Sequence, residues 1–166
     1  MKRLLFLSVC ILATVLFITG CCTTVTEKKI ENEIEAASGG DADVDIDNGT
    51  VSINTNEGSL EAGKDVDIPD GFPSDVHLID GNVTSAMQMG EGNYTVTVQT
   101  SKSTSQAKSE YREELENDGW TINFSLDVEG GSTMTGEKGE RTVSVSISED
   151  DDGGTFVVVG TSEGSE

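Results

Sequence analysis

Short segments that alternate aliphatic and polar residues constrain the fold of this chain more than any other feature. Alternation with a period of two is typical of strands that have one buried and one exposed face. The clearest case surrounds Asn48-Gly49, the pair that type I′ turns favour because both central residues adopt positive φ. This turn pairs Val44 with Ile53 and gathers the neighbouring aliphatic side chains on one face. The sequence therefore predicts a β-hairpin over residues 44–53.

The same alternation continues around one helix in the second half of the chain. A Ser103-x-x-Gln106 capping box begins this helix and Gly119 ends it. The strand that follows is expected to carry Ile122, Phe124 and Leu126 on one side. Strands are expected at 83–89, 94–100, 120–126, 133–136, 141–148 and 156–159. The expected fold class is α+β: an antiparallel sheet of about five to six strands with one helix packed on one face, preceded by a small helix-plus-hairpin module.

The N-terminus has the composition of an export signal. Lys2 and Arg3 precede an apolar run over residues 4–18, which is shorter than the roughly 20 residues that a spanning helix needs. The run ends in Ile18-Thr19-Gly20-Cys21, which resembles the lipobox of prokaryotic lipoproteins. The resemblance implies cleavage before Cys21 and lipidation of its thiol. Long acyl chains such as palmitate would then hold the protein at a membrane.

These features divide the chain into four parts. Residues 1–20 are expected to be the signal peptide, and 21–66 the lipid anchor with a helix-hairpin module. Residues 67–162 would form the α+β domain, in the order β-β-α-β-β-β-β, and 163–166 a tail. The expected localisation is membrane-anchored and extracytoplasmic, at the cell surface or the periplasmic face. A connector with both prolines should pin Phe72 and Leu78 onto the core.

Two further stretches carry a second resemblance. They read Pro69-x-x-Phe72-Pro73-x-Asp75-Val76 and Tyr111-x-x-x-Leu115-x-x-x-Gly119-Trp120. Together they resemble uncharacterised prokaryotic membrane-anchored lipoproteins that have a proline-rich leading segment, a helix and a Gly-Trp strand. The likeness covers about residues 68–162, although such relatives often have Pro where this chain has His77. Because the class has no assigned activity, the resemblance implies fold and location only.

The negative charge of the chain limits the classes of molecule that it can bind. The formal net charge is −21, with 31 acidic residues, so the surface repels nucleic acid and none is expected as a partner. Cations, basic proteins and neutral glycans remain compatible partners, and the acidity alone also keeps an exported domain soluble. Cys10 lies in the signal and Cys21 takes the lipid, so Cys22 has no partner for an intramolecular disulfide. No cofactor is expected.

Neither of the two candidate reactive sites has the pattern of an enzyme. His77 is the single histidine, and a triad would have to combine it with Ser74 or Asp75 without a nucleophile elbow. An acidic loop over residues 149–154 contains Asp150, Asp151 and Asp152, oxygen ligands that could bind Ca²⁺. A soluble hairpin tip explains the same loop. The alternating Asp43, Asp45 and Asp47 fit the wet face of a strand better than a calcium loop.

The remaining candidate is a polar sheet face. Hydroxyl and amide side chains alternate with the apolar ones on several expected strands, and they could bind an envelope protein or a glycan through many hydrogen bonds. Any half-exposed antiparallel sheet has the same pattern. The residues proposed for this partner face are Thr95, Thr97, Asn123 and Ser144. The expected function is a non-enzymatic interaction or structural module of the cell envelope; the alternative is a Ca²⁺-dependent binding module that uses the acidic loop.

Overall fold

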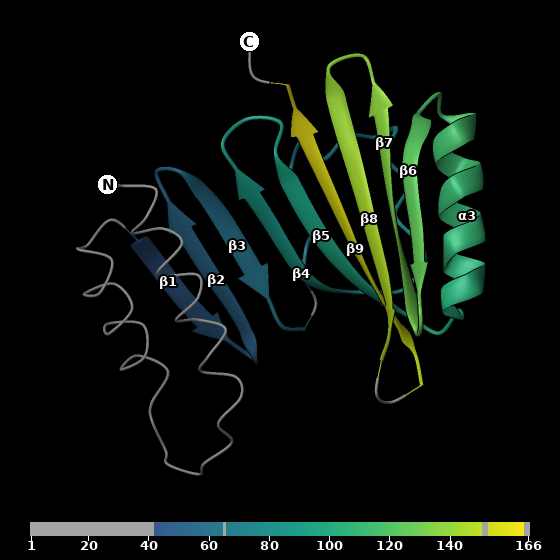
Figure 1. The fold of residues 1–166 in the computed structure, drawn as a ribbon. Helices are drawn as coiled ribbons and strands as arrows, with labels where there is room; N and C mark the ends of the chain where they lie inside the picture. The colour runs from purple at the N-terminus through teal and green to yellow at the C-terminus, as the bar shows by residue number, and fades with distance from the viewer. Residues whose placement is uncertain (1–41, 65, 151–152, 165–166) are drawn as a thin grey trace.

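A computed structural model describes residues 42–64, 66–150 and 153–164. In this part of the chain, nine antiparallel strands form one sheet, and one helix, α3 (Thr104–Asn117), follows the fifth strand in sequence (Figure 1). The sheet order is β1-β2-β3-β4-β5-β9-β8-β7-β6. The strands are β1 (Ala42–Asp47), β2 (Thr50–Thr55), β3 (Gly58–Ala62), β4 (Asn82–Met89), β5 (Tyr94–Thr100), β6 (Thr121–Val128), β7 (Gly131–Lys138), β8 (Arg141–Glu149) and β9 (Thr155–Glu163).

The expected fold class was wrong, because the sheet of the described residues has nine strands rather than five to six and is not preceded by a separate hairpin module. The predicted hairpin is not a separate module but the first two strands of the same nine-stranded sheet. The reason is β3, which pairs with β2 on one side and with β4 on the other and so joins the two parts. The register predicted for the hairpin is confirmed, because Val44 lies opposite Ile53 and Asn48 and Gly49 both have positive φ. The helix expected before the hairpin lies outside the described residues.

Side chains that are paired across neighbouring strands share a face, so each row of pairs can be followed from β1 to β6. We call the side of the sheet that packs against α3 the helix face and the other side the open face. One row on the helix face consists of Asp45, Ser52, Glu61, Ala86, Val96, Val159, Val145, Met134 and Ser125. The adjacent row on the open face consists of Val44, Ile53, Leu60, Met87, Thr95, Gly160, Ser144, Thr135 and Phe124.

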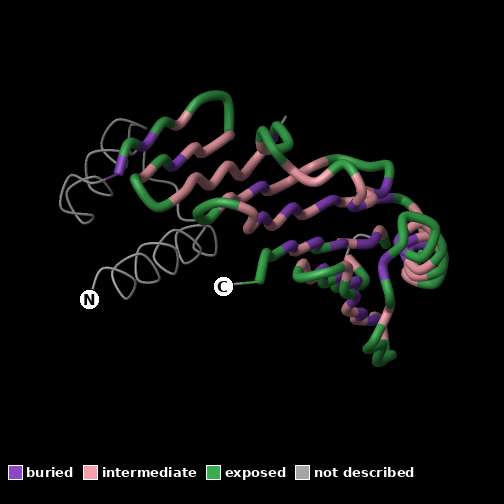
Figure 2. Tube along the Cα trace, turned by 90° about the horizontal axis from the view of Figure 1, so that it is seen from above, coloured by how far each residue is buried: buried purple, intermediate pink, exposed green. Residues whose placement is uncertain are grey.

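The hydrophobic side of the sheet therefore changes between its two ends. From β4 to β8 the buried aliphatic side chains lie on the helix face, and buried positions alternate with partly exposed ones along these strands (Figure 2). From β1 to β3 the helix face is polar, and a second, smaller cluster lies on the open face. Val44 and Ile53 are its buried centre. One sheet thus has two hydrophobic clusters on opposite faces.

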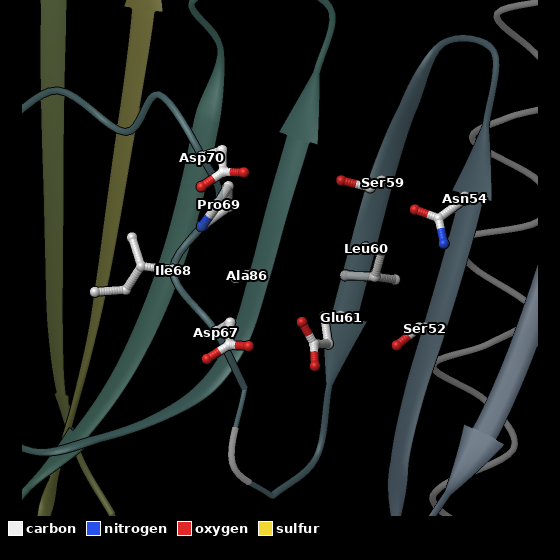
Figure 3. Close-up of a pocket in the computed structure, with 10 residues that line it drawn as sticks. All are labelled: Ser52, Asn54, Ser59, Leu60, Glu61, Asp67, Ile68, Pro69, Asp70 and Ala86. Atoms are coloured by element: carbon white, nitrogen blue, oxygen red, sulfur yellow. The ribbon is translucent and has the colours of Figure 1, made fainter.

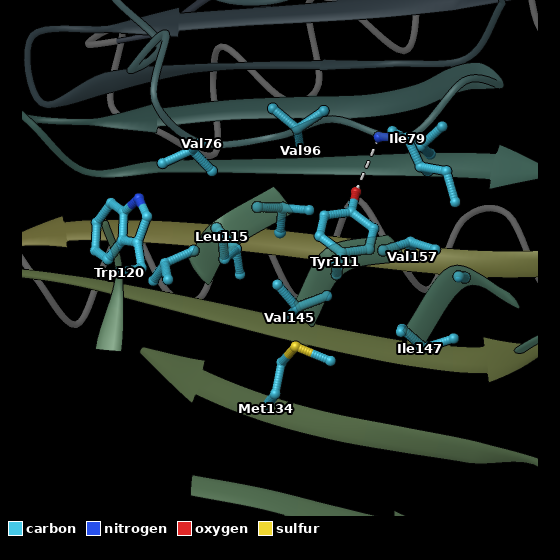
Figure 4. Close-up of a cluster of buried hydrophobic side chains, with 14 of the residues drawn as sticks. Val76, Ile79, Val96, Tyr111, Leu115, Trp120, Met134, Val145, Ile147 and Val157 are labelled. Atoms are coloured by element: carbon cyan, nitrogen blue, oxygen red, sulfur yellow. Dashed lines mark hydrogen bonds between the residues drawn. The ribbon is translucent and has the colours of Figure 1, made fainter. Parts of the chain in front are cut away.

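The main core forms where α3 packs against β6, β7 and β8. The predicted capping box is confirmed, since Ser103 accepts from the Gln106 backbone N–H and Gln106 bonds back to Ser103. Tyr111 and Leu115 are fully buried beneath the helix. The Tyr111 hydroxyl accepts a hydrogen bond of 3.1 Å from the Ile79 N–H, which ties α3 to the connector between β3 and β4 (Figure 4).

A bulge in β6 overturns the expected facing of that strand. Ile122 pairs with Gly136, but Phe124 already pairs with Thr135, so the register shifts by one residue at Asn123. A one-residue shift moves every following side chain to the other face. Ile122 packs against the core, whereas Phe124 and the apolar residues after it lie on the open face with about half of their surface exposed.

Candidate functional site

A groove lies on the helix face of the described structure, over the strands that α3 leaves uncovered. Its volume is about 530 Å³, within the usual range for small-ligand sites. One wall is formed by β2 and β3, the other by the start of the connector, and Ala86 of β4 lies at its base (Figure 3). The lining residues are Ser52, Asn54, Ser59, Leu60, Glu61, Asp67, Ile68, Pro69, Asp70 and Ala86.

The groove lies where the side chains of the helix face change from polar to apolar. Ser52, Glu61 and Ala86 are consecutive members of one row on the helix face, at the point where this row changes from polar to apolar. The apolar part of the row is covered by α3 and the connector. Because the polar part gains little from burial, no element of the described structure packs down on it. The groove lies on the helix face, between the apolar part that α3 and the connector cover and the polar part that they leave open.

The connector wall is held in place by packing and by a turn. The Phe72 N–H donates to the Pro69 carbonyl at 3.1 Å, which closes a turn at the groove. The Phe72 ring then packs edge-on against Tyr94 of β5, with ring centres 5.9 Å apart. The prediction that Phe72 and Leu78 pack on the core is confirmed. The groove wall therefore follows from a rigid attachment of the connector.

Asp75 anchors the same connector to the far end of the sheet. Its carboxylate accepts two hydrogen bonds from Arg141, at 2.9 and 2.5 Å, and one from Lys138 at 2.6 Å. Its backbone carbonyl accepts from the Trp120 indole N–H at 2.7 Å. The Arg141 hydrogen bonds, helped by Lys138, hold the pKa of Asp75 well below its ordinary value although partial burial opposes this. We call this cluster the Asp75 clasp.

Three carboxylates define the electrostatics of the groove. Glu61 on β3 and Asp67 on the connector face each other across one end, and Asp70 lies toward the other end (Figure 3). None of the described residues that line the groove is Lys, Arg or His. Ser and Asn side chains add hydrogen-bonding groups, and Ile68 and Pro69 add an apolar edge. This arrangement favours an elongated ligand with positive charge and an aliphatic stem.

His77 contacts an acidic and an aromatic side chain of α3. Its Nε2 lies 3.1 Å from a Glu110 carboxylate oxygen, and its ring packs edge-on against Tyr111. Lys102 donates to the other oxygen of Glu110 at 2.6 Å. Partial burial raises the pKa of Glu110, but the hydrogen bonds from Lys102 and His77 outweigh it and lower that pKa. Of the two residues that a triad could have combined with His77, Asp75 is engaged in the clasp.

The acidic loop is described only in part. Asp150 accepts a hydrogen bond of 2.5 Å from the Gln99 side-chain amide, while Asp151 and Asp152 lie outside the described residues. Within residues 42–64, 66–150 and 153–164, no three His, Cys, Asp or Glu side chains are grouped as ligands of a metal ion. The calcium hypothesis for this loop therefore stays a prediction. In the same ranges no helix has the length and apolar character to cross a bilayer.

The residues proposed for a partner face are brought together only in part. Thr95, Thr97 and Ser144 lie on the open face near Gly160. Asn123 stands at the β6 bulge, at the distant edge of the sheet. Ser125, the next residue but one, lies on the helix face because of the bulge. The groove itself was not predicted, since its walls come from residues far apart in sequence; the cluster of Asp67 and Asp70 around Pro69 was the available signal.

Comparison with known proteins gives one match. The model of a family described as START domain-like matches residues 82–154, less than half of the chain. The matched part runs from β4 through α3 to the end of β8. Domains of this kind are usually binding domains. No curated protein and no solved structure matches the chain.

Proposed function

We propose that this chain is a non-enzymatic lipoprotein of the cell envelope, and that its exposed domain binds an organic cation in the groove. The observation that carries the proposal is the set of Glu61, Asp67 and Asp70 along a groove of about 530 Å³ whose described lining has no basic side chain. The similarity of residues 82–154 to START domain-like proteins supports a binding role. The ligand class comes from the groove, not from this similarity.

The charge of the whole chain supports the same ligand class. With a formal net charge of −21, the protein attracts cations over a distance of about one Debye length, roughly 8 Å at physiological ionic strength. The groove concentrates this field because carboxylates stand on both of its walls. A linear cation with two or more charges could contact the pair at one end and Asp70 at the other. An aliphatic stem between the charges would lie along Ile68 and Pro69.

Titration with spermidine by calorimetry tests the groove. The variant Glu61→Gln with Asp67→Asn removes the facing carboxylates and should weaken binding about tenfold, since each exposed ion pair contributes up to about 1 kcal/mol. The matched control, Glu113→Gln with Asp118→Asn, removes one Glu and one Asp that are exposed at α3 and its C-terminus. Equal weakening in both variants would show that the net charge binds spermidine, and would contradict a groove site.

Membrane fractionation tests the anchor that the lipobox-like segment implies. Cys21→Ser should abolish incorporation of a labelled fatty acid and release the protein from membranes, because each buried CH₂ of an acyl chain contributes about 0.8 kcal/mol to anchoring. Cys22→Ser provides the control, since it removes the neighbouring thiol and should leave lipidation intact. If the Cys21→Ser protein stayed lipidated and in the membrane fraction, the lipoprotein part of the proposal would be wrong.

A further inference from the structure

A second hollow lies on the open face, over a glycine in the middle of β9. Gly160 pairs with Thr95 on one side and with Ser144 on the other. Nine glycines of the described chain have positive φ, but Gly160 is not among them, so its backbone does not require glycine. Glycine inside a strand weakens the strand and often marks a place where another molecule approaches closely. Gly160 therefore calls for an explanation other than local conformation.

A hollow of about 220 Å³ lies over this glycine. A Cβ atom at position 160 would stand 2.8 Å from the Ser144 hydroxyl oxygen, so any side chain there would force the Ser144 side chain to move into the hollow or away from it. The lining residues are Tyr94, Thr95, Thr142, Ser144, Gly160, Thr161 and Ser162. Those whose side chains share the open face with Gly160 are Thr95, Thr142, Ser144 and Ser162.

These four hydroxyl groups are available for a ligand. Within the described residues, none of them takes part in a hydrogen bond, whereas the hydroxyls of Thr55, Thr100 and Ser103 each do. Every hydroxyl can both donate and accept. The described lining also contains no charged side chain, which is unusual for a chain with 31 acidic residues. A ligand that matches this surface is neutral and has donors and acceptors in equal measure.

We infer that the hollow over Gly160 is a binding site for a single ring of a neutral glycan. Sugar hydroxyls have the same dual hydrogen-bonding character as the four protein hydroxyls, and they carry no charge that the acidic surface would repel. A hollow of about 220 Å³ is smaller than the usual sites of drug-sized ligands, which limits its occupant to a single ring. The site is independent of the groove, because it lies on the opposite face of the sheet.

Titration of the ¹⁵N-labelled protein with the methyl glycosides of glucose, galactose, mannose and N-acetylglucosamine tests the inference by NMR. At least one of them should shift the amide signals of residues 95, 144 and 160, with a dissociation constant on the order of 1 mM, as expected for a small and partly exposed ligand. Gly160→Thr fills the hollow with a residue that suits strands. This variant should weaken glycoside binding at least tenfold. It should still fold, because the Ser144 side chain that the new Cβ meets can rotate away.

Two side-chain variants keep the test decisive should Gly160→Thr disturb the strand. Thr95→Val and Ser144→Ala each remove one hydroxyl from the hollow and should weaken binding several-fold, since a hydroxyl left without its partner lowers affinity. Ser146→Ala removes a hydroxyl from the same exposed side of β8 but outside the hollow, and should bind normally. Absence of shifts with all four glycosides, or equal weakening by Ser146→Ala, would overturn the inference.

Discussion

The β1–β3 end and the β4–β9 end of this sheet differ in which face is hydrophobic. In β4–β9 the helix face is buried beneath α3 and the connector, with Val96, Val145 and Val159 fully covered. In β1–β3 the helix face carries polar side chains, and the small cluster around Val44 and Ile53 lies on the open face. Continuous hydrogen bonding through β3 joins the two ends although their hydrophobic sides are opposite.

This difference explains where the molecule offers binding surfaces. Each face of the sheet has a covered part and a polar part, and the open face also exposes Phe124 and the apolar residues after it at the β6 edge. The groove occupies the polar part of the helix face, and the hollow over Gly160 occupies the polar part of the open face. A sheet with a single hydrophobic side would leave only one face for recognition. The reversal of polarity at β3 and β4 provides two, with acidic side chains on one and hydroxyls on the other.

The largest predicted effect distinguishes the two hydrophobic clusters. Leu115→Ala should lower the free energy of unfolding by about 3 kcal/mol, because it leaves a cavity in the main core. Val44→Ala should cost only about 1.5 kcal/mol from lost burial and should raise exchange mainly in β1 and β2. Urea unfolding and amide hydrogen exchange measure both. If Val44→Ala destabilised β5, β8 and β9 as much as Leu115→Ala does, the two clusters would form one cooperative core.

The next effect concerns the Asp75 clasp, which belongs to the larger end alone. Asp75→Asn should cost about 2 kcal/mol at neutral pH, since it weakens three hydrogen bonds to charged groups. Because the folded pKa of Asp75 is lowered, this stability is complete above the ordinary aspartate pKa and is lost as the pH falls below it.

Urea unfolding of wild type and Asp75→Asn at neutral pH and at about pH 3 measures the change. The gap between the two proteins should shrink in acid. Asp80→Asn, an exposed change in the same connector, is the control and should leave stability nearly unchanged at both pH values. A gap that stays constant from neutral pH to acid would contradict the role of the Asp75 carboxylate.

A smaller effect should stay within the β1–β3 end. Gly49 has φ +87° in the hairpin turn with open space around it, so Gly49→Ala costs backbone strain of about 1 kcal/mol. Asn48→Gly keeps a residue that tolerates positive φ and should change stability by only a few tenths of a kcal/mol. Hydrogen exchange should report the Gly49→Ala effect in β1 and β2. Equal loss of protection in β8 would show that the turn supports the whole sheet.

The smallest effect tests the bulge at the far edge. Phe124→Thr should change stability by less than about 0.5 kcal/mol, because 51% of Phe124 is exposed on the open face. Ile122→Thr, two residues earlier, should cost about 1 to 2 kcal/mol because Ile122 packs against the core. Thermal unfolding of both variants measures the contrast. If Phe124→Thr lowered stability more than Ile122→Thr does, Phe124 would lie on the core side of the sheet, as simple alternation predicts.

Local features were predicted well from the sequence. The Asn48-Gly49 turn fixed the register of its hairpin, and Ser103 and Gln106 marked the start of α3, because each depends on residues only a few positions apart. The reversal at Asn123 was missed because a bulge inserts one extra residue into the strand, which breaks the period of two without a distinctive residue pattern. Every side chain after it in β6 was therefore assigned to the wrong face.

Long-range relations could not be predicted in this way. Nothing local to residues 58–62 indicates that this short strand pairs with both β2 and β4, and that pairing made one sheet of nine strands. The groove forms because the connector brings Asp67 opposite Glu61 of β3. The Asp75 clasp forms because Asp75 contacts Arg141, which lies 66 positions later in the chain. Both follow from the path of the connector over the sheet, which alternation and turn residues do not specify.

The binding of spermidine followed residue by residue in an NMR titration tests the central claim most directly. If the groove at the polarity reversal is the cation site, shifts should concentrate at residues 52, 54, 59–61, 67–70 and 86, which line it. They should also saturate with one spermidine per chain. Shifts spread instead over the exposed acidic side chains of α3 and the 149–150 turn, without saturation, would show a diffuse counterion atmosphere. The groove would then not be the site at which this protein acts.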